Sequence, residues 1–111
     1  MLRGARTLLG FVVRARNSDV GRVRDILVDD GLQARYFVVS TGWIGGRTVL
    51  LAAEWISRLD MQTGVAYADI SPEEFDTAPD YREQIPVDEG YESALYGHFR
   101  KPREGQRPGL H

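Results

Sequence analysis

The chain has no cysteine among its 111 residues, and histidine occurs only twice, at His98 and His111. The absence of cysteine excludes a disulfide framework and thiolate metal sites, and it is typical of proteins from a reducing compartment. We therefore expect a cytoplasmic protein. His98 has no second histidine three or four residues away, and His111 is the last residue, so neither one indicates a metal site or a catalytic base. We expect His98 to be a packing or surface residue.

Long apolar runs are also missing. The apolar stretch nearest the N-terminus, residues 8–13, covers six residues and is followed directly by Arg14. It is shorter than the signal-peptide core of about 7 to 15 residues and far shorter than the ~20 residues of a transmembrane helix. We expect no transmembrane segment, and we interpret this stretch as a buried first strand.

Common active-site patterns are lacking as well. The segment GWIGGRT at 42–48 resembles a phosphate-binding loop only superficially, because it has no lysine and leads into a predicted strand rather than a helix. No serine lies in a G-x-S-x-G turn, and the sequence alone does not pair Asp25, Asp29 or Asp30 across a cleft. We therefore predict no catalytic residue, no cofactor and no metal, and we expect the protein not to be an enzyme.

Lysine is almost absent, since Lys101 is the one basic residue out of 14 that is not arginine. Arginine suits phosphate and carboxylate recognition, but so uniform a preference for arginine reflects overall composition rather than a nucleic-acid site. The acidic residues are concentrated, with nine carboxylates against Arg82 in residues 69–92. Such a stretch is either a solvated face or a surface for a basic partner.

With 42% hydrophobic and 27% charged residues, the composition is that of a folded globular domain. Short apolar runs separated by turn residues predict strands. They cover residues 8–14, 20–28, 34–41, 47–52, 55–60 and 65–70. The prediction is a mainly β fold, a small six-stranded barrel whose own side chains fill the interior. In the second run, Val23 lies on one parity and Ile26 and Val28 on the other, which predicts a β-bulge at Arg24 or Asp25.

After residue 70 the sequence predicts helices. Ser71 can cap a short helix with Pro72 at its first position and Glu74 three residues after the cap, and this helix ends before Pro79. Asp88 can cap a second helix.

The second predicted helix carries an apolar stripe. Its members, spaced at i, i+4 and i+8, are Tyr91, Leu95 and Phe99. We expect this stripe to dock on the barrel wall. The predicted organisation is a barrel over residues 1–80, a helical extension over 81–102 that packs on the barrel or a partner, and a flexible tail over 103–111.

Two predicted strands are apolar on both faces, at 36–39 and 49–51. Because a half-exposed strand alternates apolar and polar residues, the outer faces of these two require cover from the C-terminal segment or a second copy. We expect self-association, most simply as a two-fold dimer, because this is the commonest closed assembly.

Trp43 and Ile44 lie among glycines in a turn, where small polar residues are usual. Trp43 either folds back to plug the barrel or serves as an interface anchor, with Arg47 just beyond the turn. The predicted partner-binding residues are Trp43, Ile44, Arg47, Tyr36 and Phe37.

An ordered series of segments covering residues 7–102 resembles the PRC-barrel family, named after the cytoplasmic barrel of the photosynthetic reaction-centre H subunit. The segments are LLGFVV (8–13), DVGRVRDILVD (19–29), RYFVVSTGW (35–43), GRTVLL (46–51), SPEEF (71–75), AP (78–79), YE (91–92) and LYG (95–97). The last four resemble the tail of bacterial tandem or stand-alone members. Two departures are Ala52-Ala53, where relatives often have proline, and residues 99–102, where many continue with more aromatics.

The resemblance implies a non-enzymatic adaptor. Members of this family occur in the reaction-centre subunit, in a ribosome-maturation factor and in many small bacterial proteins, so the fold does not dictate one chemistry. We expect a protein-interaction module that self-associates and binds an unidentified protein partner. The alternatives are an RNA-binding or ribosome-assembly factor and, less favoured, a small-molecule enzyme.

Overall fold

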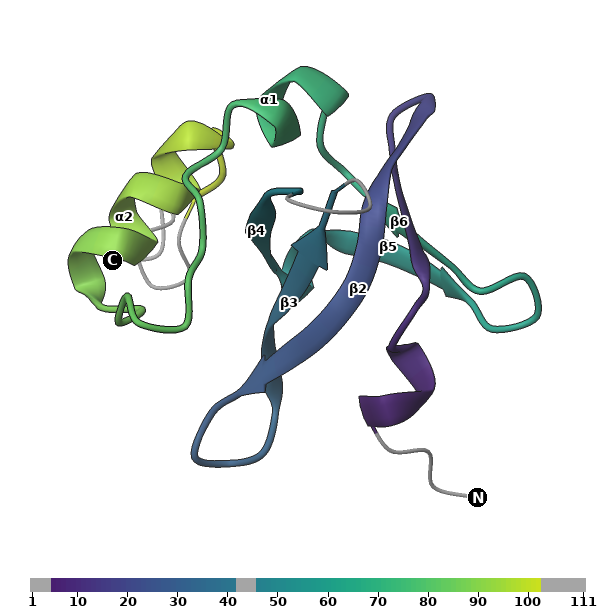
Figure 1. Cartoon of the computed structure of the whole chain (residues 1–111), viewed down its shortest axis with the longest axis horizontal. Coiled ribbons are helices and arrows are strands. Elements are labelled where there is room, and N and C mark those ends of the chain that lie inside the picture. The colour runs from purple at the N-terminus through teal and green to yellow at the C-terminus, as the bar shows by residue number, and fades with distance from the viewer. Residues whose placement is uncertain (1–4, 42–45, 103–111) are drawn as a thin grey trace.

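The computed structural model describes residues 5–41 and 46–102, and in this part of the chain six strands form one sheet (Figure 1). The strand order is β4-β3-β2-β1-β6-β5. All neighbours pair antiparallel except β1 and β6, which are parallel. The strands are β1 (Val12–Ala15), β2 (Ser18–Val28), β3 (Ala34–Ser40), β4 (Thr48–Ala52), β5 (Ile56–Asp60) and β6 (Val65–Ala68).

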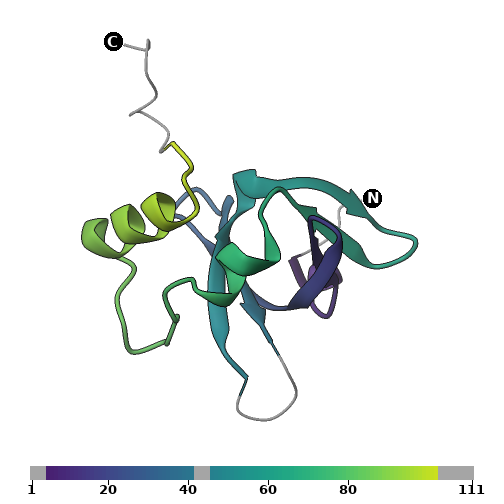
Figure 2. The same cartoon turned by 90° about the horizontal axis from the view of Figure 1, so that it is seen from above.

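The mainly β class is confirmed, but the closed barrel is wrong. Within the described residues, β4 and β5 are the two edges of the sheet, with no hydrogen-bonded ladder between them. The chain passes from one edge to the other through a short 3₁₀ helix, η2 (Ala53–Trp55). The two edge strands are therefore joined by the chain itself (Figure 2). Side chains of both strands, such as Leu51 and Ile56, also pack in one apolar cluster.

The first strand begins later than predicted. Residues Ala5–Leu8 form the 3₁₀ helix η1, and β1 starts at Val12. Between them Gly10 adopts a φ of 88°, which glycine tolerates best, and its N–H donates to the carbonyl oxygen of Val23. This turn ends the run that the apolar pattern had extended back to Leu8.

The predicted bulge in the second strand is confirmed. The register between β2 and β3 shifts between Val23 and Asp25, so Arg24 is the extra residue on β2. Val23, just before the shift, is buried, whereas Arg24 and Asp25 are exposed. A bulge bends the strand and redirects its side chains. In Figure 1 the long β2 strand curves across the sheet.

Both predicted helix starts are confirmed. Helix α1 (Pro72–Asp76) begins with a capping box, in which Ser71 Oγ accepts from the N–H of Glu74 and Glu74 Oε1 accepts from the N–H of Ser71, each at 3.0 Å. Helix α2 (Glu89–His98) begins where Asp88 Oδ1 accepts from the N–H of Tyr91 at 2.9 Å. Among the described residues, no helix is long and apolar enough to span a bilayer.

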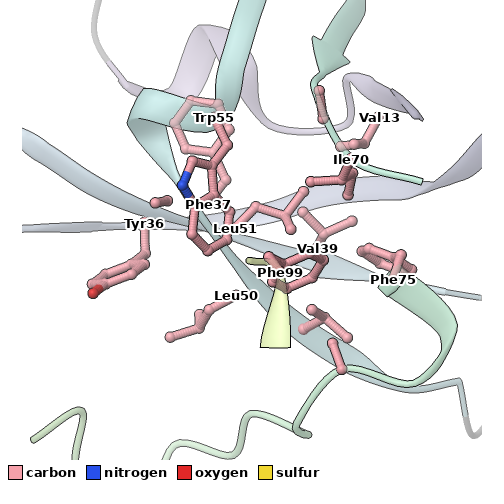
Figure 3. Close-up of a cluster of buried hydrophobic side chains, with 14 of the residues drawn as sticks. Val13, Tyr36, Phe37, Val39, Leu50, Leu51, Trp55, Ile70, Phe75 and Phe99 are labelled. Atoms are coloured by element: carbon pink, nitrogen blue, oxygen red, sulfur yellow. The ribbon is translucent and has the colours of Figure 1, made fainter. Parts of the chain in front are cut away.

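The apolar strands β3 and β4 are covered within one chain. The side chains at 36–39 and 49–52 are each at most 4% exposed. The helical extension contributes Leu95, Tyr96 and Phe99 to the same cluster. Figure 3 shows Phe99 among these side chains, and its ring lies 5.0 Å from that of Trp55. The apolar faces of β3 and β4 therefore require no second copy to cover them.

Candidate functional site

Residues 79–87, in the connection between α1 and α2, contact the start of β4 and are called the strap here. The N–H of Tyr81 donates to the carbonyl oxygen of Thr48 at 2.7 Å, which ties the strap to the start of β4. This hydrogen bond occupies a backbone carbonyl of an edge strand that could otherwise pair with another chain. In Figure 1 the strap is the green segment that leads into α2.

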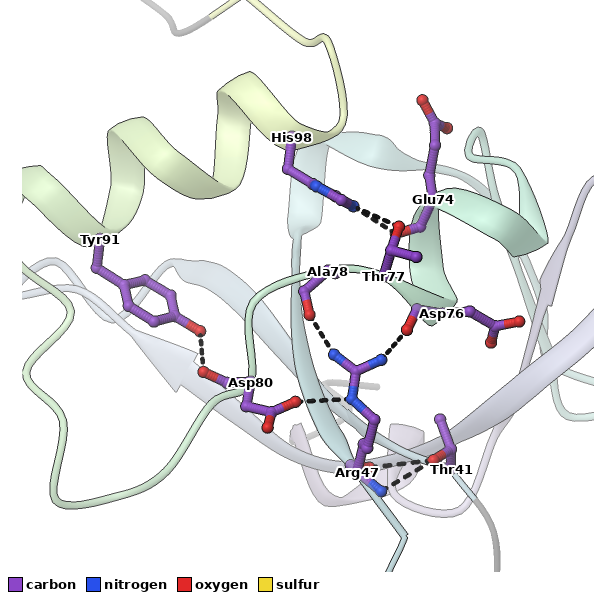
Figure 4. A network of polar contacts seen from close by, with 9 residues as sticks. All are labelled: Thr41, Arg47, Glu74, Asp76, Thr77, Ala78, Asp80, Tyr91 and His98. Carbon is purple, nitrogen blue, oxygen red and sulfur yellow. Dashed lines mark hydrogen bonds and ion pairs between the residues drawn. The ribbon is translucent and has the colours of Figure 1, made fainter.

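The side chain of Arg47 binds the start of the strap and the segment before it through hydrogen bonds (Figure 4). Its Nε donates to Asp80 Oδ1 at 2.7 Å, and its two Nη atoms donate to the carbonyl oxygens of Asp76 and Ala78. Its backbone N–H donates to Thr41 Oγ1 at 3.0 Å, which fixes the residue at the base of β4. The structure thus engages the Arg47 guanidinium inside the chain, although we predicted it at a partner interface.

Helix α2 is joined to α1 and to the strap by polar contacts at both of its ends. The hydroxyl of Tyr91 donates to the carbonyl oxygen of Asp80 at 3.0 Å. At the other end, His98 Nε2 lies 2.8 Å from the carbonyl oxygen of Glu74 and 3.1 Å from Thr77 Oγ1 (Figure 4). His98 is half-buried in this contact, in line with the packing role expected for it.

The other predicted partner-binding residues have different positions. Tyr36 and Phe37 are each 4% exposed and belong to the core, so their side chains are not on the surface. The Tyr36 hydroxyl donates to the Glu92 carboxylate of α2, and burial, followed by this hydrogen bond, raises the pKa of Tyr36. Trp43 and Ile44 lie outside the described residues, so the two alternatives for Trp43 stay predictions.

The residues predicted to dock the extension lie between α2 and the sheet. Leu95 and Phe99 are fully buried in the core, and Tyr91 packs partly buried against it. The hydrogen bond from the Tyr96 hydroxyl to Glu54 Oε2, at 2.9 Å, adds a contact to the segment after β4. The extension therefore rests on the sheet through apolar side chains and tyrosine hydroxyls together.

A cleft of about 530 Å³ opens between the strap and the sheet, a volume within the range of ligand-binding clefts. Its apolar part is formed by Leu27, Val38 and Tyr81. The polar residues that line it are Arg24, Asp25, Thr48, Arg82, Glu83 and Gln84. The β2 bulge supplies the first two of these, and the strap supplies the last three.

Side chains without an ionic partner gather at this cleft. Within residues 5–41 and 46–102, no hydrogen bond or ion pair engages the side chain of Arg24, Arg82 or Glu83, and the Asp25 carboxylate accepts only from the N–H of Ile26, at 2.8 Å. Other arginines pair with aspartates; these are Arg14, Arg16, Arg35, Arg47 and Arg58. Apolar area bordered by charges of both signs is typical of a binding surface.

The cleft was not predicted from the sequence, although one local pattern pointed to it. The phase change in the second strand predicted a bulge at Arg24 or Asp25, and bulges are frequent beside functional sites. Tyr81 and Arg82 gave no such sign, because their place beside β2 depends on the course of the strap. The described residues include no group of three or more histidine, cysteine, aspartate or glutamate side chains arranged to hold a metal ion.

The tyrosines of α2 predict a loss of stability at alkaline pH. Burial, followed by the charge of Asp80, raises the pKa of Tyr91 to about 12. Burial, followed by the hydrogen bond to Glu54, raises the pKa of Tyr96 to about 12. An unfolded tyrosine has a pKa of about 10, so the folded state holds the hydroxyl protons of Tyr91 and Tyr96 more tightly. Their stabilisation is complete below about pH 10 and is lost as the pH rises from there toward 12.

Tyrosinate absorbance and near-ultraviolet circular dichroism, followed together during an alkaline titration, test this expectation. Tyr91 and Tyr96 should ionise at a higher pH in the native chain than in the chain in denaturant, which is the control. Their ionisation should coincide with the loss of the near-ultraviolet signal. A near-ultraviolet signal that survives complete ionisation would show that α2 stays docked without its tyrosine protons.

Comparison with protein families finds a match that covers the sheet but not the extension. The family model described as the PRC-barrel domain matches residues 2–75, which end inside α1. The strap and α2 lie beyond this match, so the cleft combines β2, β3 and β4 of the matched domain with a wall that follows it. No curated protein matches the chain. Because the match covers more than half of the residues, the chain belongs to the PRC-barrel family.

Proposed function

We propose that the protein is a non-enzymatic interaction module, an adaptor that binds a segment of a protein partner in the cleft between β2 and the strap. The observation that supports this most directly is a pair of guanidinium groups, those of Arg24 and Arg82, that have no ionic partner among the described residues. They lie beside the apolar surface of Leu27, Val38 and Tyr81. A guanidinium stays protonated at all ordinary pH values, so it serves recognition rather than acid–base catalysis.

The charge pattern favours a protein partner over RNA. RNA binding draws on a stripe of basic side chains whose charges are free to meet phosphates. Here Asp25 and Glu83 line the same cleft as the two arginines, so a bound phosphate backbone would also meet two carboxylates. A polypeptide segment, which offers apolar side chains and charges of either sign, matches this lining better.

A photoreactive amino acid placed at Gln84, in the cleft, tests the proposal in the native cells of the protein. We expect it to crosslink to a protein, whereas the same group at Ala94, an exposed position on α2, should not crosslink to that protein. The Arg24→Glu/Arg82→Glu variant should abolish the crosslink from Gln84. Crosslinks to RNA would favour the ribosome-assembly alternative, and equal crosslinking from both positions would remove the cleft as the binding site.

A further inference from the structure

A protruding hairpin joins β2 to β3 (Figure 1). Its end, residues 28–33, exposes apolar side chains and is called the hairpin tip here. Leu32 is 81% exposed, and Val28, at the base of the tip, is 49% exposed. Neighbouring Asp30 is exposed and has no ionic partner among the described residues. The tip therefore presents a leucine next to a free carboxylate.

The hairpin tip is held in one conformation. Asp29 Oδ1 accepts from the N–H groups of Gly31 and Gln33 at 2.9 and 3.0 Å, and the N–H of Asp29 donates to the carbonyl oxygen of Gln33 at 3.0 Å. Leu32 has a φ of 62°, in the left-handed region that favours glycine. The fold would be served better by glycine at this position, so the leucine suggests a role outside the fold.

The hairpin tip and the cleft are complementary. Leu32 offers an apolar side chain of the kind that the cleft accepts, and Asp30 offers a carboxylate to the guanidinium of Arg24 or Arg82. In one chain the hairpin tip extends beyond the sheet (Figure 1), and Leu27, which lines the cleft, lies directly before the tip on β2, so the tip could enter its own cleft only if the hairpin folded back. A second copy places the tip there without bending the hairpin.

We propose that the hairpin tip of one copy enters the cleft of a second copy, and that the second tip enters the first cleft in return. Such a two-fold interface is isologous, since the same two surfaces meet twice. It rests on the proposed function, in that the cleft binds a protein segment, and it names that segment as residues 28–33 of another copy.

Sedimentation velocity over a wide concentration range tests the role of Leu32. The wild-type chain should dimerise reversibly, and Leu32→Gly should raise the dimer dissociation constant by at least about 30-fold, as the loss of an interface anchor does. Because glycine suits the left-handed conformation, this variant should melt at the same or a higher temperature at concentrations where both chains are monomeric, which separates lost association from unfolding. Leu59→Ala, at another exposed leucine, should leave the dimer unchanged.

Charge reversal tests which surfaces meet. Asp30→Arg and Arg82→Glu should each weaken self-association, and an equal mixture of the two variants should form a heterodimer, because both of its contacts then join opposite charges. Asp76→Arg changes the net charge as Asp30→Arg does, but its side chain lies on α1 and points away from Arg47 (Figure 4), so it should dimerise normally.

Three results would overturn the inference: a wild-type chain that is monomeric at every concentration, a Leu32→Gly chain that dimerises as wild type does, and charge variants that do not associate when mixed. A monomeric chain that still crosslinks from Gln84 to a different protein would overturn this inference and leave the proposed function standing. A dimer that forms without contact between the hairpin tip and the cleft would also overturn this inference. It would leave the proposed function standing if the crosslink from Gln84 to a different protein persists.

Discussion

Phe99→Ala is expected to lower the free energy of unfolding by about 3 to 5 kcal/mol, the range for truncating a large aromatic residue in a core. Phe99 is 2% exposed, and its ring lies 5.0 Å from the ring of Trp55. The cavity left by alanine would adjoin Trp55 and the base of α2, where the extension meets the sheet. Denaturant unfolding followed by far-ultraviolet circular dichroism measures the loss.

Leu59→Ala is the matched control for Phe99→Ala, because Leu59 is 39% exposed on β5 and its truncation should cost below about 1 kcal/mol.

Deletion of residues 86–111 removes the apolar contacts of α2 and its tyrosine hydrogen bonds together, so it should lower the melting temperature or cause aggregation. If the truncated and full-length chains melt at one temperature, the extension is a free arm for a partner instead.

Arg47→Met is expected to lower the free energy of unfolding by about 2 to 3 kcal/mol and to loosen the strap. The substitution keeps an unbranched apolar stem but removes the donor to the Asp80 carboxylate and to the carbonyl oxygens of Asp76 and Ala78. Hydrogen bonds that involve a charged group contribute about 1.5 to 3 kcal/mol each, and the side chain of Arg47 is partly exposed, so the sum is discounted.

Hydrogen exchange of the strap amides, above all the N–H of Tyr81, is the most direct measurement for Arg47→Met. Arg16→Met is the control, since it removes an exposed ion pair with Asp69 and should change the free energy of unfolding far less. Crosslinking from Gln84 should also fall in Arg47→Met, because the strap is one wall of the cleft. Unchanged exchange at Tyr81 would mean that the backbone contact to β4 alone holds the strap.

Several elements were predictable because their signals are local. The β2 bulge shows in the parity of Val23 and Ile26, and the two helix starts show in the residues around Ser71 and Asp88. The strand segments follow from apolar runs between turn residues. The apolar stripe of α2 likewise marked the residues by which the extension would be buried, and Leu95 is among them.

By itself, the sequence determined the mainly β class, the order of the strands along the chain, the bulge and the helix caps, since each depends on residues a few positions apart. Only the tertiary structure decided that the sheet stays open, that the extension covers β3 and β4, and that Arg47 faces inward. Those outcomes depend on partners far away in the sequence, such as Asp80 for Arg47 and Glu92 for Tyr36, 33 and 56 residues on. The cleft belongs to the same group, because its two walls meet only when the strap binds the start of β4, and no local pattern encodes that meeting.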